Sequence, residues 1–263
     1  MTDGEPQDLG PLPPVEEPVW VPLPPPPPEP YPFWTYIDLL LIAFMTVPCM
    51  ASGILLVRGV VWLLHQHPKL VVFELLPAQV LGYLMVFTAI GIMFRAQYGK
   101  PFWRSLAWVP SRVPFAGIAI AGVGTAVGVA IAASLLKTPE TSNPMTEMMQ
   151  DRTSLLLLTI FGVAIAPVAE ELAFRGFLQP LLVRSIGPVY GILGAAIPFG
   201  LLHFHEYGNS WRHAVVISLA GAGFGIMRER TGSTRAAAAM HAAYNAFLFL
   251  ALFSSRKDLP HLW

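Results

Sequence analysis

Long apolar stretches separated by short polar connections fill the chain after residue 33. Each supplies all or nearly all of the roughly 20 residues with which a helix crosses about 30 Å of hydrocarbon. The first and fourth exceed one span, and prolines at 48, 167 and 180 predict kinks or interruptions in them. The pattern predicts an all-α, polytopic transmembrane bundle. Its seven segments lie near 36–64, 73–95, 114–136, 154–183, 187–206, 213–230 and 234–253.

Residues 1–33 lack this apolar pattern. They contain the proline run Pro24–Pro28, and the first 36 residues carry six Asp and Glu side chains but no Lys or Arg. Such a segment has too little apolar surface to fold, so we expect a disordered, acidic, proline-rich tail before a helical domain at 34–263. Without a basic region the tail does not resemble a signal peptide, and we expect the apolar segments to remain in the mature chain.

The composition agrees with a membrane protein. Hydrophobic residues make up 54% of the 263 positions and charged residues 12%, against about 25% charged in soluble domains. Sixteen Lys and Arg balance sixteen Asp and Glu, which excludes a globally basic nucleic-acid binder. Cys49 is the single cysteine, so an intrachain disulfide and a thiolate zinc cluster are excluded.

The connections also carry an orientation signal. With seven spans, one side receives nine Lys and Arg and the other six, which favours a cytoplasmic N-terminus by the positive-inside rule. Two glycine pairs, Gly124/Gly128 and Gly221/Gly225, each lie on one helix face and predict close approach of a neighbouring helix.

Ionisable side chains occur inside the fourth segment, where each costs at least about 2.5 kcal/mol on insertion scales. Glu171 and Arg175 are four residues apart in the favourable order for a helical ion pair, which predicts a structural role. Glu170 projects about 100° away from Glu171 and needs another partner. It is therefore a candidate general acid or base, with a second structural carboxylate as the alternative.

Two later segments add polar side chains at helical spacing. Phe199 and His203 share a face of the fifth segment, and His241 and Asn245 share a face of the seventh. Taken alone, each group is explained equally by hydrogen bonds between membrane helices. His205 and Glu206, just beyond the fifth apolar segment, are interpreted as interfacial groups, and Tyr244 as a packing residue.

Helix lengths predict which of these side chains meet. With a turn at 185–188, Glu170 and His203 both lie about 22–27 Å from it along antiparallel helices and can face one another. His241 lies only about 12 Å beyond the turn at 231–233, which is expected on the same membrane side. It reaches the same level only if residues 176–186 tilt or protrude.

Together, Glu170-Glu171-x-x-x-Arg175, Phe199-x-x-x-His203 and His241-x-x-x-Asn245 resemble the CPBP family of CAAX proteases and bacteriocin-processing membrane proteases. The resemblance covers about residues 150–250. It implies an intramembrane glutamic endopeptidase without a cofactor, built from a helical bundle. The eukaryotic CAAX enzyme of this family is similar to an eight-helix bundle, whereas seven spans are counted in this sequence. Glu170 would activate water with help from His203, and His241 and Asn245 would stabilise the oxyanion. Glu171, Arg175 and Phe199 would orient the site.

The resemblance also implies a peptide or membrane-protein substrate, lipidated or not, and a bacterial inner membrane. The sequence has no His-Glu-x-x-His, Gly-x-Ser-x-Gly or Gly-x-Gly-Asp motif, which disfavours other intramembrane protease chemistries. Three alternatives stay open. They are a zinc enzyme using the two histidines and two carboxylates, a non-proteolytic scaffold or chaperone, and a proton-coupled transporter, although no inverted repeat is evident.

Overall fold

A computed structural model describes residues 30–66, 68–139 and 148–255, and all regular structure in these residues is helical. The all-α prediction is therefore confirmed. The predicted tail lies outside the described residues as far as residue 29. Residues from Tyr31 onward belong to one compact unit. Trp34 is completely buried in it, against the rings of Phe94 and Phe177.

The first two helices form an antiparallel pair. Helix α1 (Tyr36–Leu63) starts at a capping box, in which Thr35 accepts from the Asp38 backbone N–H and Asp38 accepts from the Thr35 N–H at 2.8 Å. Tyr98, the last residue of α2 (Val72–Tyr98), donates its hydroxyl to the same carboxylate at 2.6 Å. This contact ties the start of α1 to the end of α2. The short helix α3 (Phe102–Ser105) follows.

A nearly continuous helical run occupies the centre of the unit. It comprises α6 (Arg152–Ile160), the π-helix η1 (Phe161–Ile165), α7 (Ala166–Glu171), the π-helix η2 (Leu172–Leu178) and α8 (Gln179–Leu202). Within α8 the chain folds back at Gly187, whose φ of 80° and ψ of 168° are accessible essentially only to glycine. A side chain at Gly191 would collide with the Val183 backbone, so the two arms pack tightly.

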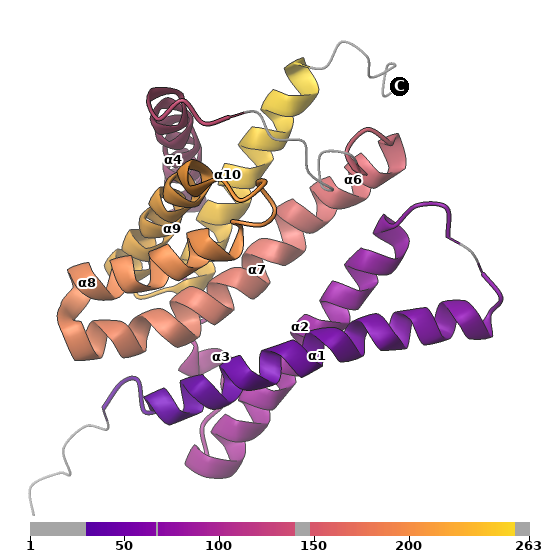
Figure 1. The fold of residues 1–263 in the computed structure, drawn as a ribbon. Coiled ribbons are helices and arrows are strands. Elements are labelled where there is room, and N and C mark those ends of the chain that lie inside the picture. Colours follow the sequence, from indigo (N-terminus) through magenta and orange to yellow (C-terminus); the bar gives the residue numbers. More distant parts are fainter. Residues whose placement is uncertain (1–29, 67, 140–147, 256–263) are drawn as a thin grey trace, which may run out of the picture. The chain divides into compact units, whose positions relative to one another are not determined.

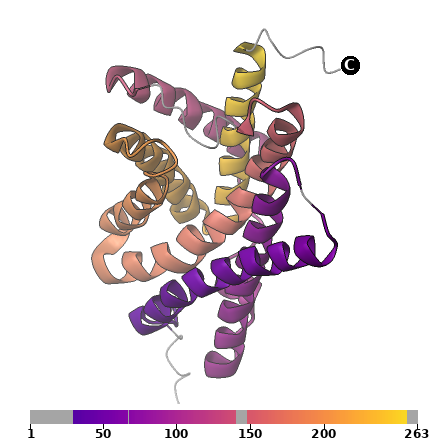
Figure 2. The ribbon, with the colours of Figure 1, turned by 45° about the vertical axis from the view of Figure 1, so that its right-hand side comes forward.

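The remaining helices are α4 (Phe115–Leu135), α9 (Trp211–Thr231) and α10 (Thr234–Ser255). The second arm of α8 packs on α9, and α10 packs on α4 and α9. The run from α6 to η2 lies between this group and the α1/α2 pair (Figures 1 and 2). Side chains of α10 reach α7 and both π-helices.

In the described part of the chain, five helices are long and apolar enough to cross a membrane, against seven predicted segments. The predicted fourth and fifth segments fall in one helical run, Arg152–Leu202. Its arm after Gly187 is only about 24 Å long, shorter than the roughly 30 Å hydrocarbon core. Helix α9 is not among the five, because charged residues at both its ends leave a short stretch of mostly small residues between them.

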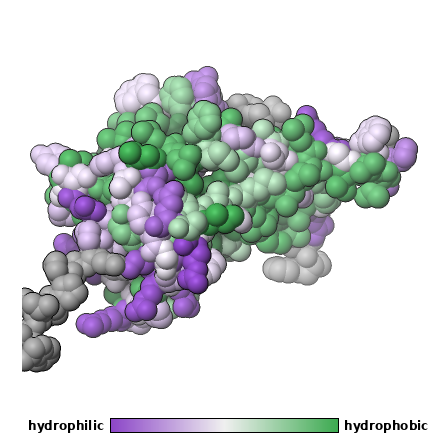
Figure 3. Space-filling view, turned by 90° about the horizontal axis from the view of Figure 1, so that it is seen from below, coloured by the Kyte–Doolittle hydropathy of each residue, from purple (hydrophilic) through white to green (hydrophobic). Residues whose placement is uncertain are grey.

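The surface is that of an integral membrane protein. On α1, Ile37, Phe44 and Trp62 are each more than 75% exposed, which is unfavourable in water and favourable in lipid. Figure 3 shows apolar side chains over much of one face, with hydrophilic side chains gathered toward one end.

The two glycine pairs behave differently. Side chains at Gly221 or Gly225 would press on Arg175, Phe199 and Gln179, so the predicted close approach is confirmed there. The prediction for Gly124/Gly128 is wrong for the described residues, since none of them has an atom within 4 Å of a Cβ built at either position. Helix α4 instead approaches α10 through Gly122, which faces the Met240 carbonyl.

Candidate active site

Helix α7 carries Glu170 and Glu171 between two π-helices. Pro167 and Pro180 stand just after these π-helices and have no N–H to donate, so they interrupt the α-helical hydrogen bonds where the sequence predicts interruption. At η1 the Ala166 N–H donates to the Phe161 carbonyl, five residues back. The next bond of this type would need an N–H from Pro167. The carbonyl of Gly162 is therefore free to accept from elsewhere.

Asn245 on α10 supplies that hydrogen bond. Its Nδ2 donates to the Gly162 oxygen at 2.7 Å. A carboxamide nitrogen carries two hydrogens, so one remains after this contact. The bond fixes the amide at the wall of a cavity, described below, that it shares with Glu170.

Glu171 and Arg175 form the predicted ion pair, and both side chains are fully buried. Arg175 Nη1 lies 2.9 Å from Glu171 Oε1, and Nη2 donates to the Gly221 carbonyl at 2.6 Å. The guanidinium lies 4.6 Å from the centre of the Phe199 ring. Phe199 therefore contacts the buried cation, as an orienting residue would.

His241 joins the two carboxylates. Its Nδ1 lies 3.0 Å from Glu171 Oε1, the oxygen that also accepts from Arg175. Its Nε2 lies 3.8 Å from Glu170 Oε2, and its ring stacks on Phe224 at 4.3 Å. Donation from Nδ1 to Glu171 directs Nε2 toward Glu170. The contacts from Arg175 to Glu171 and from Glu171 to His241 therefore direct the Nε2 atom of His241 toward Glu170, the candidate base.

The position of the α9–α10 turn explains how His241 reaches the two carboxylates. Thr234 lies beside Gly176, and its N–H and hydroxyl bond the carbonyls of Ala107 and Leu106. The turn therefore lies only a few residues from Glu171 along the central run. Residues 177–187 extend beyond it, which supplies the protrusion that the sequence analysis required.

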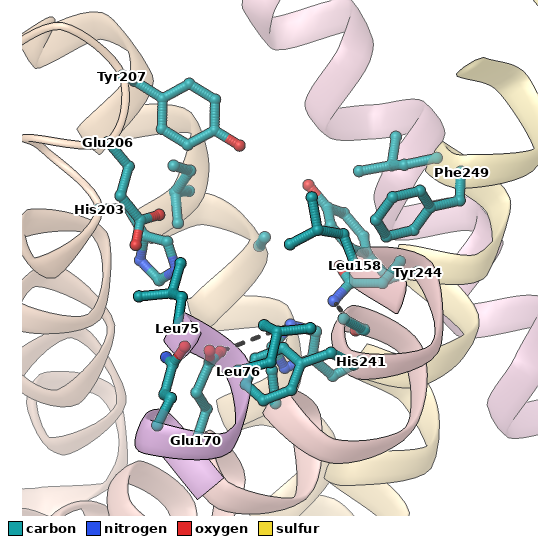
Figure 4. Close-up of a pocket in the computed structure, with 18 of the residues that line it drawn as sticks. Leu75, Leu76, Leu158, Glu170, His203, Glu206, Tyr207, His241, Tyr244 and Phe249 are labelled. Atoms are coloured by element: carbon teal, nitrogen blue, oxygen red, sulfur yellow. Dashed lines mark hydrogen bonds and ion pairs between the residues drawn. The ribbon is translucent and has the colours of Figure 1, made fainter. Parts of the chain in front are cut away.

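His203 is held by its own helix. Its Nδ1 lies 2.8 Å from the Phe199 carbonyl, so with the hydrogen on Nδ1 the other nitrogen, Nε2, is an acceptor. Figure 4 shows the ring above Glu170, on the same side of a cavity. Glu170 itself is 21% exposed in its side chain and lines that cavity.

The cavity has a volume of about 570 Å³ and brings together Glu170, His203, His241 and Asn245. All four candidate catalytic residues therefore line one space. Glu171 and Arg175 do not line it and lie behind His241.

The cavity also contains residues that the sequence analysis missed. Gln79 reaches it from α2 and donates to the Tyr83 hydroxyl at 2.8 Å. Glu206 and Tyr207, in the turn after α8, line it as well, whereas Glu206 was interpreted as interfacial. Burial raises the pKa of the Tyr207 phenol, which keeps its hydroxyl protonated. An amide in an apolar helix and the position of Glu206 three residues after His203 were available signals.

The arrangement supports general-base chemistry. A carboxylate, two imidazoles and an amide face a space large enough for a peptide segment and a water molecule. Within the described ranges, no group of three or more His, Cys, Asp or Glu side chains is arranged to hold a metal ion.

Comparison with known proteins identifies the class. Residues 152–247 match the family model described as type II CAAX prenyl endopeptidase Rce1-like. This segment, from α6 to the middle of α10, carries a CPBP-family domain of the CAAX protease type, and the protein is an integral membrane protein. No curated protein and no solved structure matches the chain.

Proposed function

We propose that this protein is an intramembrane endopeptidase in which Glu170 activates a water molecule. The observation that carries the proposal is the common cavity lined by Glu170, His203, His241 and Asn245. The CAAX protease domain at 152–247 supports a peptide or membrane-protein substrate, lipidated or not. We place the protein in a bacterial inner membrane with a cytoplasmic N-terminus.

In the proposed reaction, water binds between Glu170 and the acceptor nitrogen of His203. Glu170 takes one proton, and the oxygen attacks the carbonyl carbon of the scissile bond. The remaining N–H of Asn245 stabilises the oxyanion together with His241 in its doubly protonated form, in which Nδ1 donates to Glu171 and Nε2 donates to the oxyanion. Such donors contribute about 3–4 kcal/mol. Glu170 then gives its proton to the leaving nitrogen as the C–N bond breaks. The products are one new carboxyl terminus and one new amino terminus.

The remaining polar side chains position this machinery. Glu171 holds the His241 ring through Nδ1, and Arg175 pairs with Glu171 and orients it. Phe199 holds His203 through its carbonyl and Arg175 through its ring. The proposed mechanism uses no metal or other cofactor.

A comparison of membrane peptides from cells carrying wild type or Glu170→Gln tests the proposal. We expect peptide products in wild type that are absent in the variant, while the variant keeps its melting temperature. Glu229→Gln, an exposed substitution on α9, is the matched control and should keep the products. Identical peptide profiles for wild type and Glu170→Gln would instead support a non-proteolytic scaffold.

A further inference from the structure

The cavity around Glu170 is lined by both polar and apolar side chains (Figure 4). Polar groups from α7, the end of α8 and the following turn form one side: Glu170, His203, Glu206 and Tyr207. The lining from α6 and α10 is mixed, with the polar His241, Tyr244 and Asn245 next to a group of apolar side chains: Leu158, Leu248, Phe249 and Leu252. A segment that fills this space must be amphipathic.

The cavity is also unbalanced in charge. Its described lining contains two carboxylates, Glu170 and Glu206, and no Lys or Arg. Arg175 is fully buried behind the lining, where it pairs with Glu171 and the Gly221 carbonyl. Clefts lined by one sign of charge concentrate the opposite sign, so this cavity favours cations and disfavours anions.

Glu206 lies in the turn after α8, and its side chain is exposed. Its turn is closed by a hydrogen bond from the Asn209 N–H to the Phe204 carbonyl at 3.0 Å, and the adjacent Tyr207 stacks on His213 of α9 at 4.9 Å. No described residue forms an ion pair with Glu206, and its carboxylate lies beside the His203 ring in Figure 4. It is free to bind a charged group entering the cavity.

We infer that Glu206 is a specificity-determining residue that binds a Lys or Arg side chain of the substrate next to the scissile bond. The substrate is then an amphipathic peptide segment, with its basic residue on the Glu206 side and its apolar residues against α6 and α10. This inference rests on the proposed function, since it assigns the substrate of the same site.

The test uses the full-length protein in lipid nanodiscs and a peptide pool read by mass spectrometry. Products that are absent with Glu170→Gln identify the peptides that the protein cleaves. Each of these peptides is then synthesised in two forms, with either Lys or norleucine next to the scissile bond. We expect kcat/KM to be about tenfold higher for the Lys peptide, and the advantage to shrink with added salt. In Glu206→Gln, kcat/KM for the Lys peptide should approach kcat/KM for the norleucine peptide. In Glu206→Lys, the enzyme should prefer Glu-containing peptides.

Two further variants test the role of Glu206 separately from the proposed peptidase activity. Glu206→Asp should retain part of the preference, and Glu229→Gln should leave it unchanged. Equal cleavage of the Lys and norleucine peptides by wild type, or an unchanged ratio in folded Glu206→Gln, overturns the role of Glu206 and leaves the peptidase standing. If no product in the pool depends on Glu170, the proposed function fails and this inference fails with it.

Discussion

The Asn245 side chain donates to the Gly162 carbonyl across 2.7 Å, and this carbonyl lacks a helical partner because Pro167 stands five residues later. A break in the backbone hydrogen bonds of one helix thus positions a polar side chain of another. The contact joins α10 to the central run next to the carboxylates.

Replacing Asn245 by Leu should therefore reduce stability as well as activity. The Gly162 oxygen would lose its partner, and an unsatisfied buried acceptor costs about 1–3 kcal/mol. Denaturant unfolding in detergent measures the change. Ser254→Ala, an exposed substitution on the same helix, should change the unfolding free energy by less than about 0.5 kcal/mol. Equal stability of the two variants would contradict the structural role of Asn245.

Substitution by Gln should affect stability at Glu171 and cleavage at Glu170. Glu171→Gln leaves the buried Arg175 guanidinium without its counter-charge, a loss that typically costs about 3–5 kcal/mol. Glu170→Gln removes only a long contact, 3.8 Å to His241, so it should abolish cleavage while the protein stays folded. The melting temperatures and product yields of both variants test this difference. If only Glu170→Gln lowers the melting temperature, Glu170 is the structural carboxylate and Glu171 is not.

His203 should matter for rate and little for stability. His203→Gln removes the ring nitrogen that helps position water, and loss of acid–base assistance typically lowers kcat by about 10²–10⁴-fold. His205→Gln on the same turn is the matched control, since His205 does not line the cavity. If both variants lose activity equally, the turn itself and not the His203 ring is responsible.

The backbone at Gly187 provides a test of the fold. Gly187→Ala forces a side chain into a conformation with φ of 80°, so we expect destabilisation of about 1–3 kcal/mol. Gly59→Ala in α1 meets no neighbouring atom and should be neutral or slightly stabilising. Thermal unfolding of the two variants, compared with wild type, shows whether the reversal in α8 depends on glycine.

Activity should survive removal of metal ions. The proposed water activation uses Glu170 and His203 and no metal ion, so protein treated with a chelator and shown by elemental analysis to be metal-free should cleave at the untreated rate. Inactivation that only added zinc restores would favour the zinc alternative and would count against glutamate chemistry.

Much of the arrangement could be predicted from spacing. The periodicity of three and four residues placed Glu171 against Arg175 and Asn245 on the face of His241, since these relationships depend on helix geometry alone. The number of spans could not be predicted in the same way. Hydropathy does not reveal that α8 reverses after Gly187, or that α9, ending in Arg228, Glu229 and Arg230, is sheltered by neighbouring helices.

The positions of Gln79 and Glu206 in the cavity wall could not be predicted from the sequence, because they depend on packing between distant segments. Gln79 lies about 90 residues before Glu170, in a helix outside the matched segment 152–247. Only packing of α1 and α2 against the central run brings it to the site. The cavity position of Glu206 was not predicted, because polarity next to an apolar segment usually indicates the lipid headgroup region and says nothing of a cavity beside it.

The modest hydrophobicity of α9 has a consequence for folding. This helix supplies the Gly221 carbonyl to Arg175 and the Phe224 ring to His241, yet it is not among the five helices that are long and apolar enough to cross a membrane. Until α9 packs against the central run, the Arg175 guanidinium lacks its Gly221 carbonyl ligand. The candidate active site is therefore complete only when α9 has packed against the central run, so correct folding of this one helix sets the geometry of the whole site.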